Sequence, residues 1–184
     1  MNTKRDIVAL ATVLLILLFL LIHTANAGAQ TRARADIQDS AGKTIGSAAL
    51  TERGAGVLIT VNVKGLPQGL HAVHIHAVGK CEGPAFTSAG PHFSPLKKKH
   101  GFKNPDGPHA GDLPDMYVNK DGVGRYEVLA DSITLGAGET SIFDADGTTI
   151  IIHVTADDNV TDPAGNSGDR IACGVITRAA AKKM

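Results

Sequence analysis

Residues 57–63, Val-Leu-Ile-Thr-Val-Asn-Val, have the pattern of a β-strand with one buried face. Branched apolar residues occupy every second position, and a period of two is typical of a half-buried strand. Residues 123–129, 148–155 and 171–177 also alternate or are rich in β-branched residues. Asp121-Gly122 and Asp146-Gly147 are dipeptides of the kind found in hairpin turns. No useful helical period occurs after residue 30, so the sequence predicts an all-β sandwich or barrel.

Between these strands, residues 77–113 are rich in glycine, proline, lysine and histidine. A stretch this long without regular structure is uncommon in a compact domain and is usually functional or disordered. It contains His92, His100, His109 and Asp112, in the spacing His-x7-His-x8-His-x2-Asp. Three imidazole nitrogens and one carboxylate oxygen complete a tetrahedral zinc shell. We therefore predict a zinc site that orders this loop.

A second group of histidines surrounds the predicted loop. His74 and His76 form a His-x-His pair, and on a strand both would point to one face while Ile75 points to the other. His153 lies in the β-branched run 148–155, whereas His71 has the opposite parity to the pair and is not expected to be a ligand. Three imidazoles without thiolate or carboxylate suit copper. Two metals are therefore expected.

Composition argues against other classes. The chain has two cysteines, Cys81 and Cys173, and no Cys-x-x-Cys, so a zinc finger is excluded. A zinc hydrolase with two metals would need more carboxylate ligands than Asp112 alone. Its 18 basic and 18 acidic residues do not give the strongly basic surface of a nucleic-acid-binding protein, so no nucleic-acid partner is expected.

The N-terminus predicts export. Lys4 and Arg5 precede an apolar run at residues 7–22, and Ala25-Asn26-Ala27 follows shortly after that run. These are the three parts of a secretory signal peptide, residues 1–27, with cleavage after Ala27. The alternative is an uncleaved membrane anchor through residues 7–22. In either case residues 28–184 form one domain, expected to be periplasmic or secreted. There, an even pair of cysteines predicts a Cys81–Cys173 disulfide, the alternative being two buried free thiols.

Six motifs carry a resemblance to one family. They are Gly-Leu-His-Ala-Val-His-Ile-His at 69–76, Ala-Gly-Pro-His-Phe at 89–93, Lys-His-Gly at 99–101, His-Ala-Gly-Asp-Leu at 109–113, Ile-Ile-His at 151–153 and Gly-Asn-Ser-Gly-Asp-Arg-Ile-Ala-Cys-Gly-Val-Ile at 165–176. In this order they resemble the copper/zinc superoxide dismutases of the bacterial secreted type. The resemblance implies an eight-stranded Greek-key β-barrel with two long functional loops. It also implies one copper and one zinc per subunit, leaves a homodimer open, and makes superoxide the substrate.

The resemblance assigns roles to individual residues. Copper would be bound by His74, His76, His92 and His153, and zinc by His92, His100, His109 and Asp112. His92 would bridge both metals as an imidazolate and carry a proton for the peroxide. Asp157 resembles the acid that orients ligands of both metals, and Arg170 resembles the arginine that guides the anion. The alternatives are a plain loop aspartate and a surface arginine.

One feature departs from the family. Residues 157–169 form a short second loop, in which Asp162 is present and lysine is absent. The resemblance implies that charges of this loop steer superoxide in the family, but the short loop of this chain is not expected to do so. Either Lys97, Lys98 and Lys99 attract the anion from the first loop, or steering is weak and these lysines are a solvated basic run. The alternative function is a non-catalytic, exported copper-binding protein of the same fold.

Overall fold

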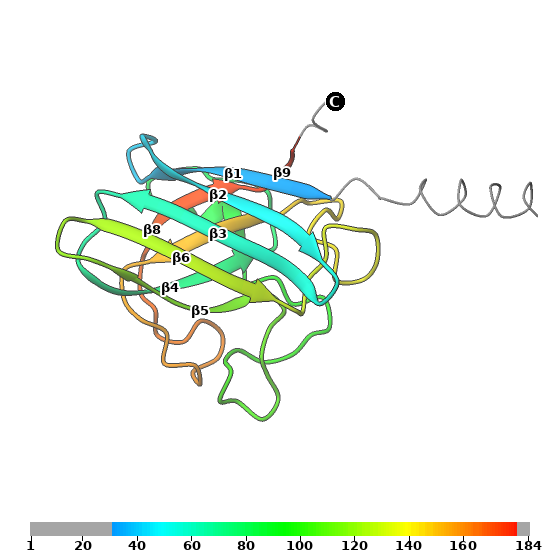
Figure 1. The fold of residues 1–184 in the computed structure, drawn as a ribbon. Helices are drawn as coiled ribbons and strands as arrows, with labels where there is room; N and C mark the ends of the chain where they lie inside the picture. The colour runs from blue at the N-terminus through cyan, green and yellow to red at the C-terminus, as the bar shows by residue number, and fades with distance from the viewer. Residues whose placement is uncertain (1–30, 180–184) are drawn as a thin grey trace, which may run out of the picture. The chain divides into compact units, whose positions relative to one another are not determined.

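Eight antiparallel strands close into a barrel in the computed structural model, which describes residues 31–179 (Figure 1). Around the barrel the strands follow the order β2-β3-β6-β5-β4-β7-β8-β1, and pairing of β1 with β2 closes it. A short ninth strand continues along β1 beyond β8. The strands are β1 (Arg32–Asp39), β2 (Thr44–Arg53), β3 (Gly56–Lys64), β4 (Gly69–His76), β5 (Asp112–Val118), β6 (Val123–Ala130), β7 (Thr149–His153), β8 (Arg170–Val175) and β9 (Thr177–Arg178). The predicted eight-stranded Greek-key barrel is confirmed.

The two crossovers of this topology bring the histidine-bearing strands together. The chain passes from β3 to β4 and from β6 to β7 without pairing them, and β4 lies directly beside β7. Their antiparallel register pairs His74 with Ile151 and His76 with Thr149. His153, at the end of β7, therefore lies beside the same part of β4 although it is far away in sequence.

The strands predicted from alternation match β3, β6, β7 and β8 within two residues at each end, with β9 covering the last predicted residue. Asp121-Gly122 forms the turn between β5 and β6, where Gly122 has a φ of 75°. The prediction for Asp146-Gly147 was wrong in one respect, because this turn lies in the long connection from β6 to β7. There, the carbonyl of Asp146 accepts a hydrogen bond from the amide of Gly79 at 2.9 Å, so the turn supports the first loop rather than a hairpin.

Strands β4 and β7 are buried on both faces. Their inward side chains join the barrel core, whereas the outward Ile151 packs in a second cluster with Phe86, Ala89 and Cys173. The first loop, residues 77–111, supplies Phe86 and Ala89 and thus covers the outer face. It has one turn of 3-10 helix, Thr87–Ala89, and a disulfide joins its Cys81 to Cys173 of β8. The predicted disulfide is confirmed.

The predicted signal segment, residues 1–27, lies outside the described residues. Among residues 31–179, the structure contains no helix that could span a bilayer.

Candidate metal centre

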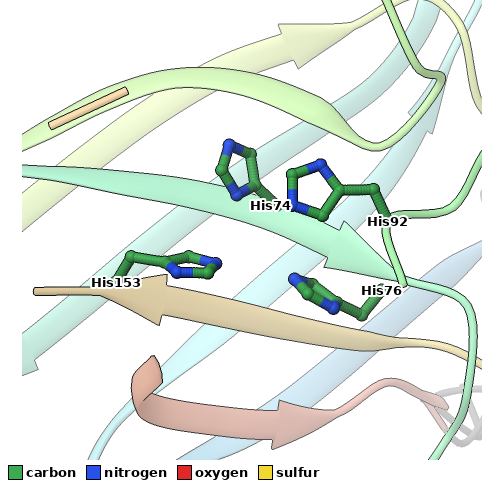
Figure 2. A group of neighbouring side chains, drawn as sticks. All are labelled: His74, His76, His92 and His153. Carbon is green, nitrogen blue, oxygen red and sulfur yellow. The ribbon is translucent and has the colours of Figure 1, made fainter. Parts of the chain in front are cut away.

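Four buried histidines converge outside the barrel, between β4, β7 and the first loop (Figure 2). His74 and His76 come from β4, His153 from the end of β7, and His92 from the loop, which a β-bridge fixes against His76. One ligand atom from each of the four residues lies within 4.8 Å of the others. The structure therefore brings together the residues predicted as the copper set.

Each of these rings uses one nitrogen to hold its orientation. Two rings contact carboxylates: His74 Nε2 lies 2.7 Å from Asp157 Oδ2, and His92 Nδ1 lies 2.9 Å from Asp112 Oδ1. Two rings contact backbone carbonyls: His76 Nδ1 lies 2.9 Å from Gly90 O, and His153 Nδ1 lies 3.0 Å from Gly168 O. The other nitrogen of each ring is buried and has no hydrogen-bond partner among the described residues. These four atoms are His74 Nδ1, His76 Nε2, His92 Nε2 and His153 Nε2. Buried polar atoms without partners are rare and costly, so four together fit a metal ion.

The second predicted set surrounds one oxygen of Asp112. Its Oδ1 lies 2.9 Å from His92 Nδ1, 3.0 Å from His100 Nδ1 and 3.3 Å from His109 Nδ1. Ligands about 2.0 Å from a tetrahedral zinc are about 3.3 Å apart, close to these separations. The other oxygen, Asp112 Oδ2, accepts hydrogen bonds at 2.9 Å from the amides of Gly101 and His109, which fixes the carboxylate.

His74 competes with His109 for a place in this second set. By distance alone, His74 groups with His92, His100 and Asp112 within 4.8 Å. However, its Nε2 is engaged by Asp157 and its Nδ1 is one of the four unpartnered atoms of the first set. His109 Nδ1 directly contacts Asp112 Oδ1 and lies 3.4 Å from His92 Nδ1. By these contacts, His109 fits the second predicted set better than His74 does.

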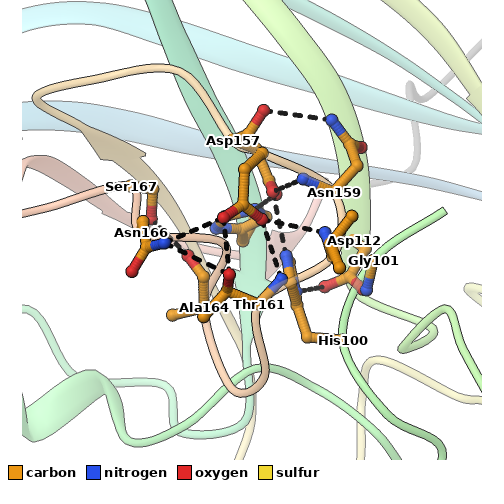
Figure 3. A network of polar contacts seen from close by, with 12 residues as sticks. His100, Gly101, Asp112, Asp157, Asn159, Thr161, Ala164, Asn166 and Ser167 are labelled. Carbon is orange, nitrogen blue, oxygen red and sulfur yellow. Dashed lines mark hydrogen bonds and ion pairs between the residues drawn. The ribbon is translucent and has the colours of Figure 1, made fainter. Parts of the chain in front are cut away.

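Asp157 contacts one histidine of each set, and Figure 3 shows it beside His100. Its Oδ2 contacts His74 Nε2 at 2.7 Å, and its Oδ1 contacts His100 Nε2 at 2.9 Å. The amide of Asn159 also donates to Oδ1 at 2.6 Å. One carboxylate thus orients a histidine of each set, in the position that the sequence resemblance implied for Asp157.

Burial and charge divide the metal-free histidines into two kinds. Burial lowers the pKa of His92 to about 4 and that of His153 to about 3, and also holds the pKa of His76 well below its usual value. These rings are neutral at pH 7, the form that binds metals. Burial also acts on His100, but hydrogen bonds to Asp112 and Asp157 outweigh it and raise its pKa to about 9. For Asp112, hydrogen bonds from the histidines likewise outweigh burial and lower its pKa.

Arg170 is fixed beside the first set. Its Nη1 donates to Phe86 O at 2.7 Å and its Nη2 donates to Gly90 O at 2.8 Å. The same Gly90 carbonyl accepts from His76, so guanidinium and ring are held by one acceptor. Of the three lysines, Lys99 pairs with Asp162 at 3.1 Å, and all three are exposed.

Sequence reasoning missed several supporting residues. Asp162 was noted only as a loop charge, but its Oδ1 accepts a hydrogen bond from the His100 amide at 2.9 Å. Asp115 was not singled out, and it binds the backbone of Asp157 at 3.1 Å. The Gly90 carbonyl that holds Arg170 could not be identified either. No local pattern indicates such contacts, since they join segments that meet only in the fold.

Comparisons with known proteins identify relatives of this arrangement. Residues 44–176 match the family described as copper/zinc superoxide dismutase (SODC). A copper/zinc superoxide dismutase of Aquifex aeolicus, numbered 2, is 48% identical over 159 residues, covering 85% of this chain and 93% of the relative. The superoxide dismutase-like protein YojM of Bacillus subtilis is 43% identical over 138 residues, covering 73% and 70%. A crystal structure of a SOD-like protein from Bacillus subtilis matches with a TM-score of 0.74 at 40% identity, covering 77% and 95%.

Proposed function

The chain belongs to the copper/zinc superoxide dismutase family and is a superoxide dismutase, and we propose that the two histidine sets hold its metals. The proposed copper ligands are His74, His76, His92 and His153, and the proposed zinc ligands are His92, His100, His109 and Asp112. The main support is the group of four buried ring nitrogens that have no partner among the described residues. Neutral imidazoles suit copper, and three nitrogens with one carboxylate suit zinc.

Copper, when bound, supplies a one-electron couple, so that one superoxide loses an electron and leaves as dioxygen while a second takes that electron and two protons and leaves as hydrogen peroxide. Zinc, which has no redox chemistry, would hold the geometry. His92 is the residue shared by the two sets, since its Nε2 is unpartnered and its Nδ1 contacts Asp112. We propose that His92 would help to hold both metals, with Nε2 on the copper side and Nδ1 on the zinc side, and that Nε2 would hold a proton for the peroxide when copper does not occupy it.

We propose that Arg170 binds the anion. A guanidinium has five N–H groups, and its contacts with the carbonyls of Phe86 and Gly90 leave other N–H groups for a small anion. The carbonyl contacts also prevent the side chain from swinging away from His76. In this role Arg170 orients superoxide, while Asp157 holds His74 and His100 in position.

Turnover of superoxide by the purified protein tests the proposal. The protein loaded with copper and zinc should dismutate superoxide in the presence of EDTA, a chelator that suppresses catalysis by free copper(II), and the zinc-only protein should be inactive. Stoichiometric copper without turnover would instead favour a non-catalytic copper-binding protein, an alternative that matters because one relative is named superoxide dismutase-like. Hydrolytic activity with zinc alone would favour a zinc hydrolase.

We further propose that the protein is exported and cleaved after Ala27, acting in the periplasm or outside the cell. The Cys81–Cys173 disulfide supports this location, because disulfides persist in oxidising compartments. Mass spectrometry of the protein isolated from a cell fraction would give the N-terminus. A start at Gly28 supports cleavage, and an intact N-terminus in the membrane fraction would show anchoring through residues 7–22. Self-association into a homodimer stays a prediction, which sedimentation of the purified protein tests.

A further inference from the structure

The pairing of β4 with β5 contains a β-bulge. One residue of β4, Ala72, faces two residues of β5, Pro114 and Asp115. The flanking residues Leu113 and Met116 both belong to the barrel core although they are three positions apart, because the extra residue resets the alternation of side chains. Bulges of this kind redirect side chains, frequently next to active sites. Here the redirected side chain is that of Asp115.

The bulge anchors the segment that leads from β7 into the second loop, residues 157–169. The amide of Ala72 donates to the carbonyl of Thr155 at 2.9 Å. Asp115 Oδ1 accepts a hydrogen bond from the amide of Asp157 at 3.1 Å. The chain between Thr155 and Asp157 is therefore held by one bond from each of the two strands.

From this anchored backbone the Asp157 carboxylate reaches both metal sets. It contacts His74 Nε2 at 2.7 Å and His100 Nε2 at 2.9 Å. The direction of that carboxylate depends on where its own backbone lies. We propose that Asp115 is a positioning residue for the metal pair, which acts by fixing the backbone of Asp157 and thereby the rings of His74 and His100. This inference rests on the proposed function, since it takes both histidines to be ligands.

The choice of an acid at position 115 also argues for a specific role. Asp115 is partly buried and lies next to another carboxylate, Asp157. Burial and the charge of Asp157 raise the pKa of Asp115, although the hydrogen bond from the Asp157 amide opposes this. Burial and the neighbouring Asp157 therefore destabilise the charged carboxylate of Asp115. Its structural contribution is the oxygen that accepts the hydrogen bond from the Asp157 amide. An asparagine has the same shape and would supply that acceptor without the charge.

The test compares Asp115→Ala with Asp115→Asn. Zinc(II) and copper(II) affinities of the purified metal-free proteins are measured by competition with chelators, and their melting temperatures are measured in parallel. Asp115→Ala should lower the zinc affinity about tenfold. Loss of a residue that hydrogen-bonds to a ligand typically costs about 10- to 100-fold, and the smaller effect is expected because Asp115 acts through Asp157. Asp115→Asn should restore most of the affinity. Asp121→Ala, which removes an exposed acid from the turn between β5 and β6, is the matched control and should bind zinc as the wild type does.

A double variant separates positioning from general destabilisation. With Asp157→Ala already present, Asp115→Ala should cause no further loss of zinc affinity, because the intermediate group is gone. Losses that add in the double variant overturn the inference. So does a lower melting temperature of Asp115→Ala with both metal affinities unchanged. Failure of the proposed function would look different, since the wild type itself would then not bind one zinc and one copper.

Discussion

At the scale of single residues, the metal centre depends on which nitrogen of each histidine is committed. A neutral imidazole carries one N–H and one lone pair. Where the N–H donates to an oxygen, as in His76 to Gly90 and His153 to Gly168, the lone pair at Nε2 is directed into the unpartnered group. Among the four histidines of the proposed copper set, only His92 uses its other nitrogen, Nδ1, to contact a residue of the proposed zinc set, Asp112. This difference leads to a prediction about metal binding.

His92→Ala should lower superoxide turnover by at least about a hundredfold and loosen both metals, because one residue of each proposed set is lost. Metal analysis after dialysis against a chelator, together with an activity assay, measures this. His153→Ala is the matched control, since it belongs only to the copper set and should leave zinc bound. Full occupancy of both metals in His92→Ala would contradict the bridging assignment.

Zinc uptake should release a proton from His100. In the metal-free protein its folded pKa is about 9, above the usual value of 6.5, so the ring is charged at neutral pH and must lose that proton to bind zinc. Zinc affinity should therefore rise with pH until about 9. The contribution of His100 to the stability of the metal-free protein has the opposite trend, being full below about pH 6.5 and lost as pH rises through about 9.

Calorimetry tests the proton release. Zinc titrations near neutral pH are made in two buffers with different ionisation enthalpies. For about one proton released per zinc, the two binding heats should differ by about the difference between those ionisation enthalpies. Equal heats in both buffers would show that His100 is already neutral before zinc binds.

At the scale of elements, the second loop closes tightly over the link between the metal sets. Gly165 has a φ of 61°, and a Cβ atom there would collide with Asp157 Oδ1 and lie 2.6 Å from His100 Nε2. Gly165→Ala should therefore separate Asp157 from His100 and weaken zinc by at least about tenfold. Gly42→Ala is a matched control, because Gly42 also has a positive φ, 80°, but no atom within 4 Å of the added carbon. Equal zinc affinity in the two variants would show that the loop adapts without cost to the site.

The first loop is fastened to the barrel by the disulfide between Cys81 and Cys173. The bond closes a chain segment with a sequence separation of 92 residues. In the chain-entropy model a loop of about this length corresponds to roughly 4 to 5 kcal/mol, with measured values often lower. Reduction should lower the melting temperature and make residues 77–113 easier to cleave, as limited proteolysis with mass spectrometry would reveal. Unchanged cleavage after complete reduction would mean that the packing of Phe86 and Ala89 alone holds the loop.

At the scale of the whole molecule, charge determines how superoxide approaches. Removing residues 1–27 leaves 16 basic and 17 acidic residues, and the second loop contains no lysine. Any long-range attraction would therefore have to come from elsewhere, and Lys97, Lys98 and Lys99 form a basic run in the first loop. Lys99 is already paired with Asp162, which reduces its contribution.

Salt dependence separates steering from docking. Arg170→Ala should lower turnover while copper stays bound, with little change in salt dependence, because its contact with the anion is local. Neutralising Lys97, Lys98 and Lys99 together should lower the rate at low salt and flatten its dependence on ionic strength, since exposed charges are screened beyond about 10 Å at 0.1 M salt. Turnover measured across ionic strengths provides both results. Identical profiles for the wild type and the triple lysine variant would remove the lysines from the mechanism.

The parts of the fold that the sequence predicted are those with a local signal. Alternation revealed β3, β6, β7 and β8, whereas β1, β2 and β5 were missed. The stretch from Arg32 to Arg53 consists mainly of alanine and polar residues, and three of its six buried hydrophobic positions are alanines, Ala33, Ala35 and Ala48, beside the larger Ile37, Ile45 and Leu50. Alanine does not distinguish an inner from an outer face by hydrophobicity, so these strands are recognised only by their pairing.

The sequence by itself determined the all-β class, the paired cysteines and the residues proposed as ligands, because the type and spacing of those side chains limit the metals that they suit. Tertiary structure decided which nitrogen of each ring is free, how Asp157 reaches two histidines, and how a bulge directs Asp115 to the backbone behind them. It also decided that Gly90 holds both His76 and Arg170. These features depend on distances between atoms of β4, β5, β7 and two loops. Such distances exist only once the strands have paired, and no local stretch of the chain encodes them.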